Sequence, residues 1–144
     1  MTRIKDLGKL LQGMKPALAK GEYVFCTVSE SALRGLGNAP MLIFREKEGI
    51  TVVLEKKIAT KNALSYSGTW AMITLTVHSD LAAVGLLATV TGELAKEGIS
   101  VNAVSAYCHD HLFVPRAAAE KAVGLLRLLS QKAGRDKLSG NPHK

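Results

Sequence analysis

The alternation of apolar and polar residues predicts a strand over residues 71–77 and a helix after it. Every second position of this strand is apolar, which is the period of a half-buried strand: Ala71, Ile73, Leu75 and Val77. Within 81–97 the apolar positions recur at helical spacing, and either Ser79 or Asp80 could cap the amino end of that helix. The pattern therefore predicts a strand followed by an amphipathic helix.

The rest of the second half predicts a hairpin and a closing helix. Segments 99–107 and 112–114 are rich in strand-forming residues, and the chain reverses between them near His109-Asp110. Apolar residues at helical spacing predict a last helix over about 117–129. The second half thus has the order strand, helix, strand, strand, helix.

The first half predicts the same order of elements. Apolar runs at 23–28, 41–44 and 50–54 predict strands, and 55–64 predicts a short charged helix. Between the first two strands, residues 29–40 are rich in Ser, Gly, Asn and Pro, so we expect a loop or a single helical turn there. A short amphipathic helix should precede the half, with these apolar residues on one face: Ile4, Leu7, Leu10 and Leu11.

The repeated order predicts an α+β fold of the ferredoxin-like βαββαβ kind, with antiparallel sheets and helices on one face. The flexible stretch 65–68 marks the seam, so we expect an N-terminal half with its leading helix over 1–67 and a C-terminal half over 68–133. Residues 134–144 have no apolar face and should form a flexible tail. The second half lacks a fourth strand after Leu129; either the halves exchange strands, or the N-terminal helix and the 71–77 strand are shared between them.

Composition narrows the functional class. The chain is 47% apolar and 22% charged, so it can bury a core. Its net charge of +7 is spread over both ends, and aromatic residues make up only 5%, so we expect no nucleic-acid partner. The longest uncharged apolar stretch, Leu81–Gly92, is too short to span a bilayer, and the N-terminus lacks the apolar run of a signal peptide. We therefore expect a cytoplasmic protein without a membrane partner.

The segment ITLTVHSDLAAVGLLATVTGELAKEGISVNAVSAYCHDHLFVP resembles the ACT domain, a βαββαβ module that senses small molecules, usually amino acids. Its AYCHDHLFVP stretch is similar to a bacterial group of short tandem ACT-like proteins. More distantly, it is similar to the paired ACT domains of aspartate kinases and of cytosolic arginine sensors. The resemblance implies a non-enzymatic regulatory protein, without a cofactor, that binds an amino acid or similar small zwitterion at an interface between ACT domains. Because small sheets leave edge strands uncovered, we also expect a homodimer.

A ligand site can be proposed at the turn between the 71–77 strand and the following helix. Backbone N–H groups at a helix N-terminus lack intrahelical partners and favour an anion, so those near Val84, Gly85 and Leu86 could hold a carboxylate. Asp110 is the one acid in 98–116 and could hold an ammonium group; in the arginine sensors that this chain resembles, an aspartate at the matching position has this role. The expected site also includes His109 and a floor made by Ile99, Ser100, Val101 and Asn102.

Other interpretations of the same residues remain open. Ser79 or Asp80 could simply cap the helix while Gly85 eases its packing, and Asp110 could do no more than shape a turn. The histidines His78, His109 and His111 could serve a metal site or a small enzyme, although their spacing matches no established metal motif, so we assign no metal ligand. No catalytic motif is recognisable, and no catalytic residue is assigned. The chain could also be a ligand-free interaction module.

Overall fold

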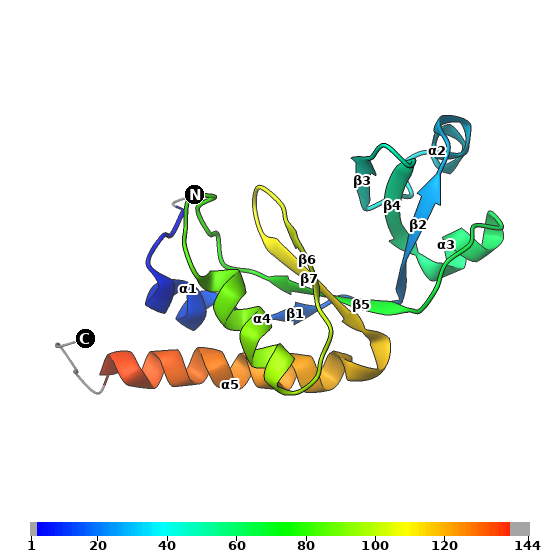
Figure 1. The fold of residues 1–144 in the computed structure, drawn as a ribbon. Helices are drawn as coiled ribbons and strands as arrows, with labels where there is room; N and C mark the ends of the chain where they lie inside the picture. The colour runs from blue at the N-terminus through cyan, green and yellow to red at the C-terminus, as the bar shows by residue number, and fades with distance from the viewer. Residues whose placement is uncertain (1–2, 139–144) are drawn as a thin grey trace. The chain divides into compact units, whose positions relative to one another are not determined.

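The computed structural model describes residues 3–138, which form two compact units (Figure 1). The first unit is Lys20–Ala71, and the second combines the residues up to Ala19 with those from Met72 onward. This division differs from the halves 1–67 and 68–133 expected from the sequence, since the amino-terminal segment packs in the second unit.

The first unit is a small antiparallel sheet with two helices. Strand β4 lies between β3 and β2, and the first residue of β5 pairs with β2, through Trp70 and Tyr23, to give the order β3-β4-β2-β5. The predicted strands are confirmed. Helix α2 is longer than the single turn expected, because Ser29 caps it by accepting a hydrogen bond from the Ala32 N–H. The elements are β2 (Tyr23–Val28), α2 (Glu30–Leu36), β3 (Leu42–Arg45), β4 (Ile50–Glu55), α3 (Lys56–Lys61) and β5 (Trp70–Leu75).

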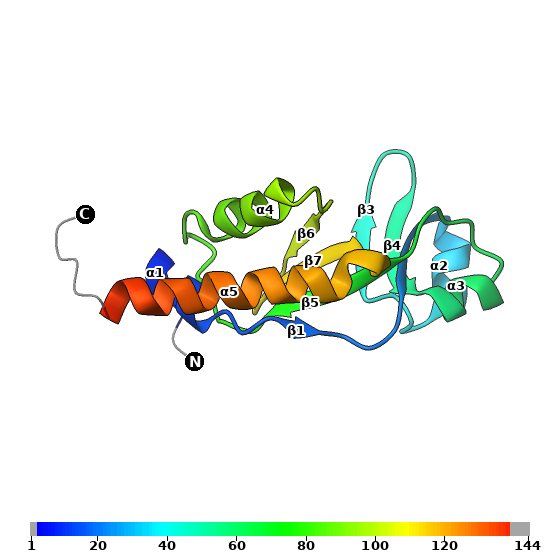
Figure 2. The same cartoon turned by 90° about the horizontal axis from the view of Figure 1, so that it is seen from below.

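The second unit repeats this arrangement along the rest of β5. Its strands have the order β6-β7-β5, and β1 pairs with the other edge of β5. Helix α5 packs against β1 and β7 and also against α1 and α4; Figure 2 shows α5 running along the strands. The elements are α1 (Leu7–Gly13), β1 (Ala17–Leu18), α4 (Leu86–Lys96), β6 (Asn102–Ser105), β7 (Asp110–Pro115), a 3-10 turn (Arg116–Ala118) and α5 (Ala119–Leu138).

Strand β1 answers the question of the missing fourth strand. It pairs antiparallel with β5, with Ala17 opposite Thr74 and Leu18 opposite Ile73. The Ala19 N–H donates to the Met72 carbonyl at 2.9 Å and extends the pairing by one residue. Both units therefore have the same strand order, and the α+β, ferredoxin-like fold is confirmed.

Helix α1 anchors the amino-terminal segment to the second unit. Asp6 caps it by accepting from the Lys9 N–H at 2.9 Å, and Leu10 and Met14 are fully buried. Ile4, expected within this helix, is extended and forms a bridge with Ser79. The segment before β1 is thus part of the second unit's core.

Two other helix boundaries differ from the prediction. Helix α4 begins at Leu86 rather than near 81, because the carboxylate of Asp80 accepts from the Ala82 N–H at 2.8 Å and shapes a turn instead of capping the helix. Helix α5 continues to Leu138, so the first part of the expected tail from 134 is helical, while 139–144 lie outside the described residues. Over residues 3–138, no helix is long and apolar enough to cross a membrane.

Candidate functional site

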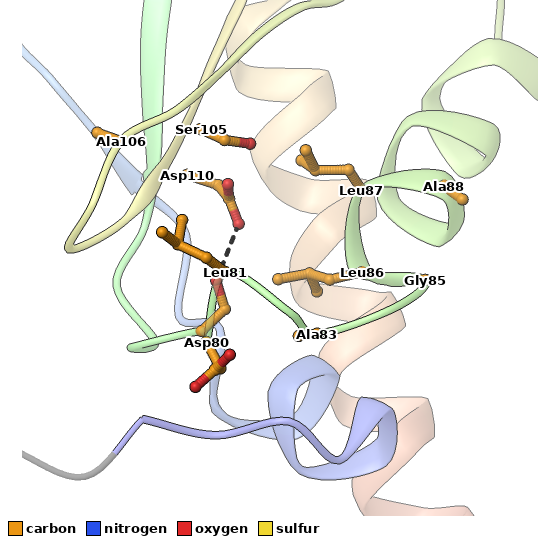
Figure 3. A pocket seen from close by; sticks show the side chains of 11 residues that line it. Asp80, Leu81, Ala83, Gly85, Leu86, Leu87, Ala88, Ser105, Ala106 and Asp110 are labelled. Atoms are coloured by element: carbon orange, nitrogen blue, oxygen red, sulfur yellow. Dashed lines mark hydrogen bonds between the residues drawn. The ribbon is translucent and has the colours of Figure 1, made fainter.

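A cavity of about 150 Å³ lies in the second unit, between the start of α4 and the turn that joins β6 to β7 (Figure 3). It is smaller than the pockets of roughly 300–1,000 Å³ that hold drug-sized ligands, so it suits a small molecule. Its walls combine apolar side chains with two serines and two aspartates. The lining residues are Ser79, Asp80, Leu81, Ala83, Gly85, Leu86, Leu87, Ala88, Ser105, Ala106 and Asp110.

Asp110 supplies the buried charge of the cavity. It is the first residue of β7 and only 6% exposed, and it is the one buried charged side chain among the residues whose burial is described, 3–136. Ser79 Oγ donates to Asp110 Oδ2 at 3.3 Å, and no cationic side chain of the described residues forms an ion pair with it. Figure 3 shows the second aspartate, Asp80, with its carboxylate turned away from Asp110. A buried carboxylate without a cation is costly, so a positively charged ligand group would be stabilised here.

The amino end of α4 supplies hydrogen-bond donors to the same cavity. Its N-cap is Gly85, at φ +100°, and no side chain caps the helix. The first helical hydrogen bond runs from the Thr89 N–H to the Gly85 carbonyl, so the amides of Leu86, Leu87 and Ala88 precede the ladder and have no intrahelical partner. All three residues line the cavity. The helix dipole adds partial positive charge at this end, which favours an anionic ligand group.

The amino-terminal segment holds the walls of the cavity in place. Arg3 donates to the Tyr107 carbonyl at 2.6 Å and its guanidinium lies 3.8 Å from the centre of the Tyr107 ring, in the β6–β7 turn. The Ile4 N–H donates to the His78 carbonyl, and the Ile4 carbonyl accepts from the Asp80 N–H, both at 2.9 Å. These contacts connect the amino-terminal segment to the β6–β7 turn and to the loop that leads into α4.

The three histidines lie side by side near Asp110 but do not form a metal centre. The rings of His78 and His109 are 4.6 Å apart between centroids, and those of His109 and His111 are 6.3 Å apart. His111 Nδ1 is 2.9 Å from Thr74 Oγ1. Burial lowers the pKa of His111 below its ordinary value, and the nearby His109 lowers it further, while Asp110 raises it. Within residues 3–138, no group of three or more His, Cys, Asp or Glu side chains could hold a metal ion, so the geometry gives no support to the metal interpretation.

The structure brings together part of the residue set proposed from the sequence. Gly85, Leu86 and Asp110 line one cavity, whereas Val84 is 83% exposed and does not. His109 lies in the turn before β7, where its carbonyl accepts from the Ala106 N–H.

The floor proposed from the sequence lies elsewhere in the second unit. Ile99, Ser100, Val101 and Asn102 follow the carboxyl end of α4, and none of them lines the cavity. Eleven residues of α4 separate the two ends of the helix, a distance of about 16 Å. Within one chain, these four residues therefore lie away from this cavity.

Sequence reasoning missed Leu87, Ala88, Ser105 and Ala106 as wall residues. The first two enter because α4 starts later than predicted, and the signal for this start was Gly85, whose positive φ suits glycine. Ser105 enters because it pairs with Asp110 across the β6–β7 hairpin, in a register that the sequence pattern does not fix.

Two family models match the chain, both described as ACT domain, over residues 2–71 and 66–127. A crystal structure of a Vibrio cholerae protein of unknown function, described as a possible transport protein, is similar at 44% identity and a TM-score of 0.77, covering 88% of this chain and 97% of that one. An Agrobacterium tumefaciens protein is 21% identical, with a TM-score of 0.63 and coverage of 80% and 87%. The ligand-free regulatory subunit of aspartate kinase from Thermus thermophilus is 10% identical, with a TM-score of 0.61 and coverage of 79% and 96%, and shares the fold.

None of the curated proteins matches the chain. The two family models together span most of it, and each overlaps the greater part of one of the two units. The chain therefore belongs to the ACT-domain family and carries two ACT domains in tandem.

Proposed function

We propose that this chain is a non-enzymatic regulatory protein that binds one small amino acid, or a similar zwitterion, in the cavity of the second unit. The observation that carries the proposal is the pairing of a buried carboxylate, Asp110, with three unpaired amides, those of Leu86, Leu87 and Ala88, on the walls of one cavity.

The two ends of a zwitterion match these two features. The amides and the helix dipole suit the α-carboxylate of the ligand, as at other anion sites on helix N-termini. Asp110 suits the α-ammonium, through a charge-assisted hydrogen bond that replaces the missing cation. Leu81, Leu86 and Leu87 leave apolar surface for a small side chain. The ammonium and carboxylate groups of the ligand thus pair with Asp110 and with the amides of α4, which lack such partners in the free protein.

The relatives support a regulatory role for such a site. One neighbour is the regulatory subunit of an aspartate kinase, and another is an Escherichia coli aspartokinase III solved in complex with aspartate and ADP, at 14% identity. The present chain covers 32% of the length of that kinase. We therefore place this chain with the sensing modules and not with the catalytic ones.

The proposal includes a homodimer. Strands β3 and β6 lie at sheet edges and are mostly exposed, which leaves backbone donors and acceptors open for pairing. A second copy could also bring its Ile99–Asn102 segment to the ligand, which the same chain cannot do. Sedimentation should show a dimer at micromolar concentration; a 15.4 kDa monomer across the whole range would contradict this part of the proposal.

The binding test begins with a thermal-shift screen of the twenty amino acids. A ligand at about 100 times its Kd should add about 2.7 kcal/mol of apparent stability. Calorimetry with the best amino acid then compares the wild type with Asp110→Asn. Loss of one partner from a buried charge pair costs about 2–5 kcal/mol, so the affinity should fall by about 30-fold or more.

The matched control is Asp80→Asn, the same chemical change on the same cavity. Because the Asp80 carboxylate turns away from Asp110 and an amide oxygen can still accept from the Ala82 N–H, the affinity should stay within a few-fold. Unchanged affinity in Asp110→Asn, or equal losses in both variants, would refute the site.

A further inference from the structure

We infer that the chain carries one such ligand site and that the first unit has lost its counterpart; this inference rests on the proposed function. Both units have the same strand order, so each position of the site has an equivalent in the first unit. Two features make the site in the second unit, and each is replaced in the first by a group that cannot bind a zwitterion.

The hairpins that carry the decisive residue are equivalent. Four residues join β3 to β4 and four join β6 to β7, and in each turn the first N–H donates to the last carbonyl at 3.0 Å. Strands β4 and β7 have the same burial pattern along all six positions, with the first, third, fourth and fifth buried. The register pair Ser105–Asp110 of one hairpin therefore corresponds to Arg45–Ile50 of the other.

Ile50 thus occupies the place of Asp110 in the first unit. Each of the two residues is 6% exposed, so the position is equally buried in both units. Ile50 belongs to an apolar core with Val28 and Leu36, the residues that end β2 and α2. The position that holds a buried carboxylate in one unit is part of the hydrophobic core in the other, and an ammonium group has nothing to bind there.

The helix that follows the first strand of each unit also differs, in a way that leaves no anion site at the start of the helix in the first unit. In the first unit Ser29 comes directly after β2 and its Oγ accepts from the Ala32 N–H at 3.2 Å, so α2 already has a cap, and Glu30 adds a negative charge to its first turn. In the second unit ten residues, 76–85, separate β5 from α4, whose first turn has neither a side-chain cap nor an acid. Of these two helices, α4 is the one that presents free amides to a ligand.

Because of these differences, two domains of the same fold differ in function. The second unit binds the ligand, and the first unit contributes structure or contacts but no second site of this kind. The chain should therefore take up one amino acid molecule, not two.

Calorimetry with the amino acid that gives the largest thermal shift tests this inference through its stoichiometry. We expect one molecule per chain in the wild type, loss of binding in Asp110→Asn by at least 30-fold, and unchanged binding in Ile50→Val, which alters the equivalent position conservatively. Two molecules per chain, or one site of unaltered affinity left in Asp110→Asn, would overturn the inference while leaving amino-acid binding intact.

Amide chemical shifts give a second readout that needs no variant. Titration with the same amino acid should move the signals of residues 79–88 and 105–111 and leave those of 28–36 and 45–51 in place. Comparable shifts in both sets would overturn the inference. Failure of the wild type to bind any of the twenty amino acids would refute the proposed function, and the inference with it.

Discussion

Replacement of Asp110 by isoleucine should stabilise the free protein while it removes the ligand site. Asp110 is 6% exposed, and its carboxylate accepts a long hydrogen bond of 3.3 Å from Ser79. Burial of an isoleucine side chain is worth about 1.5–3 kcal/mol, and relief of a poorly satisfied buried polar group adds about 1–3 kcal/mol. The loss of the Ser79 hydrogen bond offsets about 1 kcal/mol of this gain.

The net gain for Asp110→Ile is therefore about 1.5–5 kcal/mol. The neighbouring cavity of about 150 Å³ gives room for the extra methyl groups, so overpacking should be small. For a chain of this size the gain corresponds to a rise in Tm of about 3–20 °C.

Thermal unfolding followed by circular dichroism, with and without the amino acid found in the screen, measures both effects. The variant should melt higher than the wild type and show no ligand-induced shift. The reciprocal change at the equivalent position, Ile50→Asp, should lower the Tm sharply, because it places an unpaired carboxylate in an apolar core. A lower or unchanged Tm in Asp110→Ile would refute the reasoning that this residue is kept for binding at a cost in stability.

Three further changes test the packing and electrostatics of the second unit. Since the pKa of His111 is lowered in the folded state, the contribution of His111 to stability is present above about pH 6.5 and is lost as the pH falls through the folded pKa. In urea unfolding, the stability of His111→Gln should therefore depend less on pH than that of the wild type. An equal pH dependence in the two proteins would contradict this. Met14→Ala, at a fully buried position, should cost about 2–5 kcal/mol in urea, whereas Leu128→Ala, at a position 59% exposed, should change stability by about 0.5 kcal/mol or less. Gly85→Ala should lower the free energy of unfolding by about 1–3 kcal/mol, because φ of Gly85 is +100°. Gly92→Ala, within α4 and with open space around it, should raise the free energy of unfolding by about 0.5–1 kcal/mol. A change of the same sign in both variants would show that the strain at Gly85 is absent.

Local sequence patterns were sufficient for most of the fold. The period of two over 71–77 gave β5, and the apolar runs on each side of Gly49 gave the β3–β4 hairpin, since both signals depend on neighbouring residues alone. The fourth strand of the second unit could not be found in this way. Strand β1 has two residues, Ala17 and Leu18, which are too few to show a period, and its partner is a distant segment.

At the candidate site, two local sequence signals compete, and they do not decide where α4 begins. Asp80 and Gly85 are both acceptable helix starts, and the choice depends on the Asp80 carboxylate, which accepts from the Ala82 N–H instead. The prediction therefore included Gly85 and Leu86 but placed the amides two residues too early. Asp110 was identified as the one acid in 98–116 and from the family resemblance, whereas its burial depends on tertiary packing that the sequence does not display.

The pairing of β1 with β5 makes the first unit a domain insertion within the second. The insertion begins after Ala19 and ends before Met72, and these two residues face each other across the ladder, joined by a hydrogen bond of 2.9 Å. Antiparallel strands that meet in this way can be closed by a two-residue turn such as Asn-Gly. Excision of Lys20–Ala71 with that turn in its place would leave β1, the Met72–Leu75 part of β5 and every wall of the cavity on one shorter chain. A cut at the boundary between the sequence repeats would instead separate β5 from β1 and α1, and so divide the domain that holds the site.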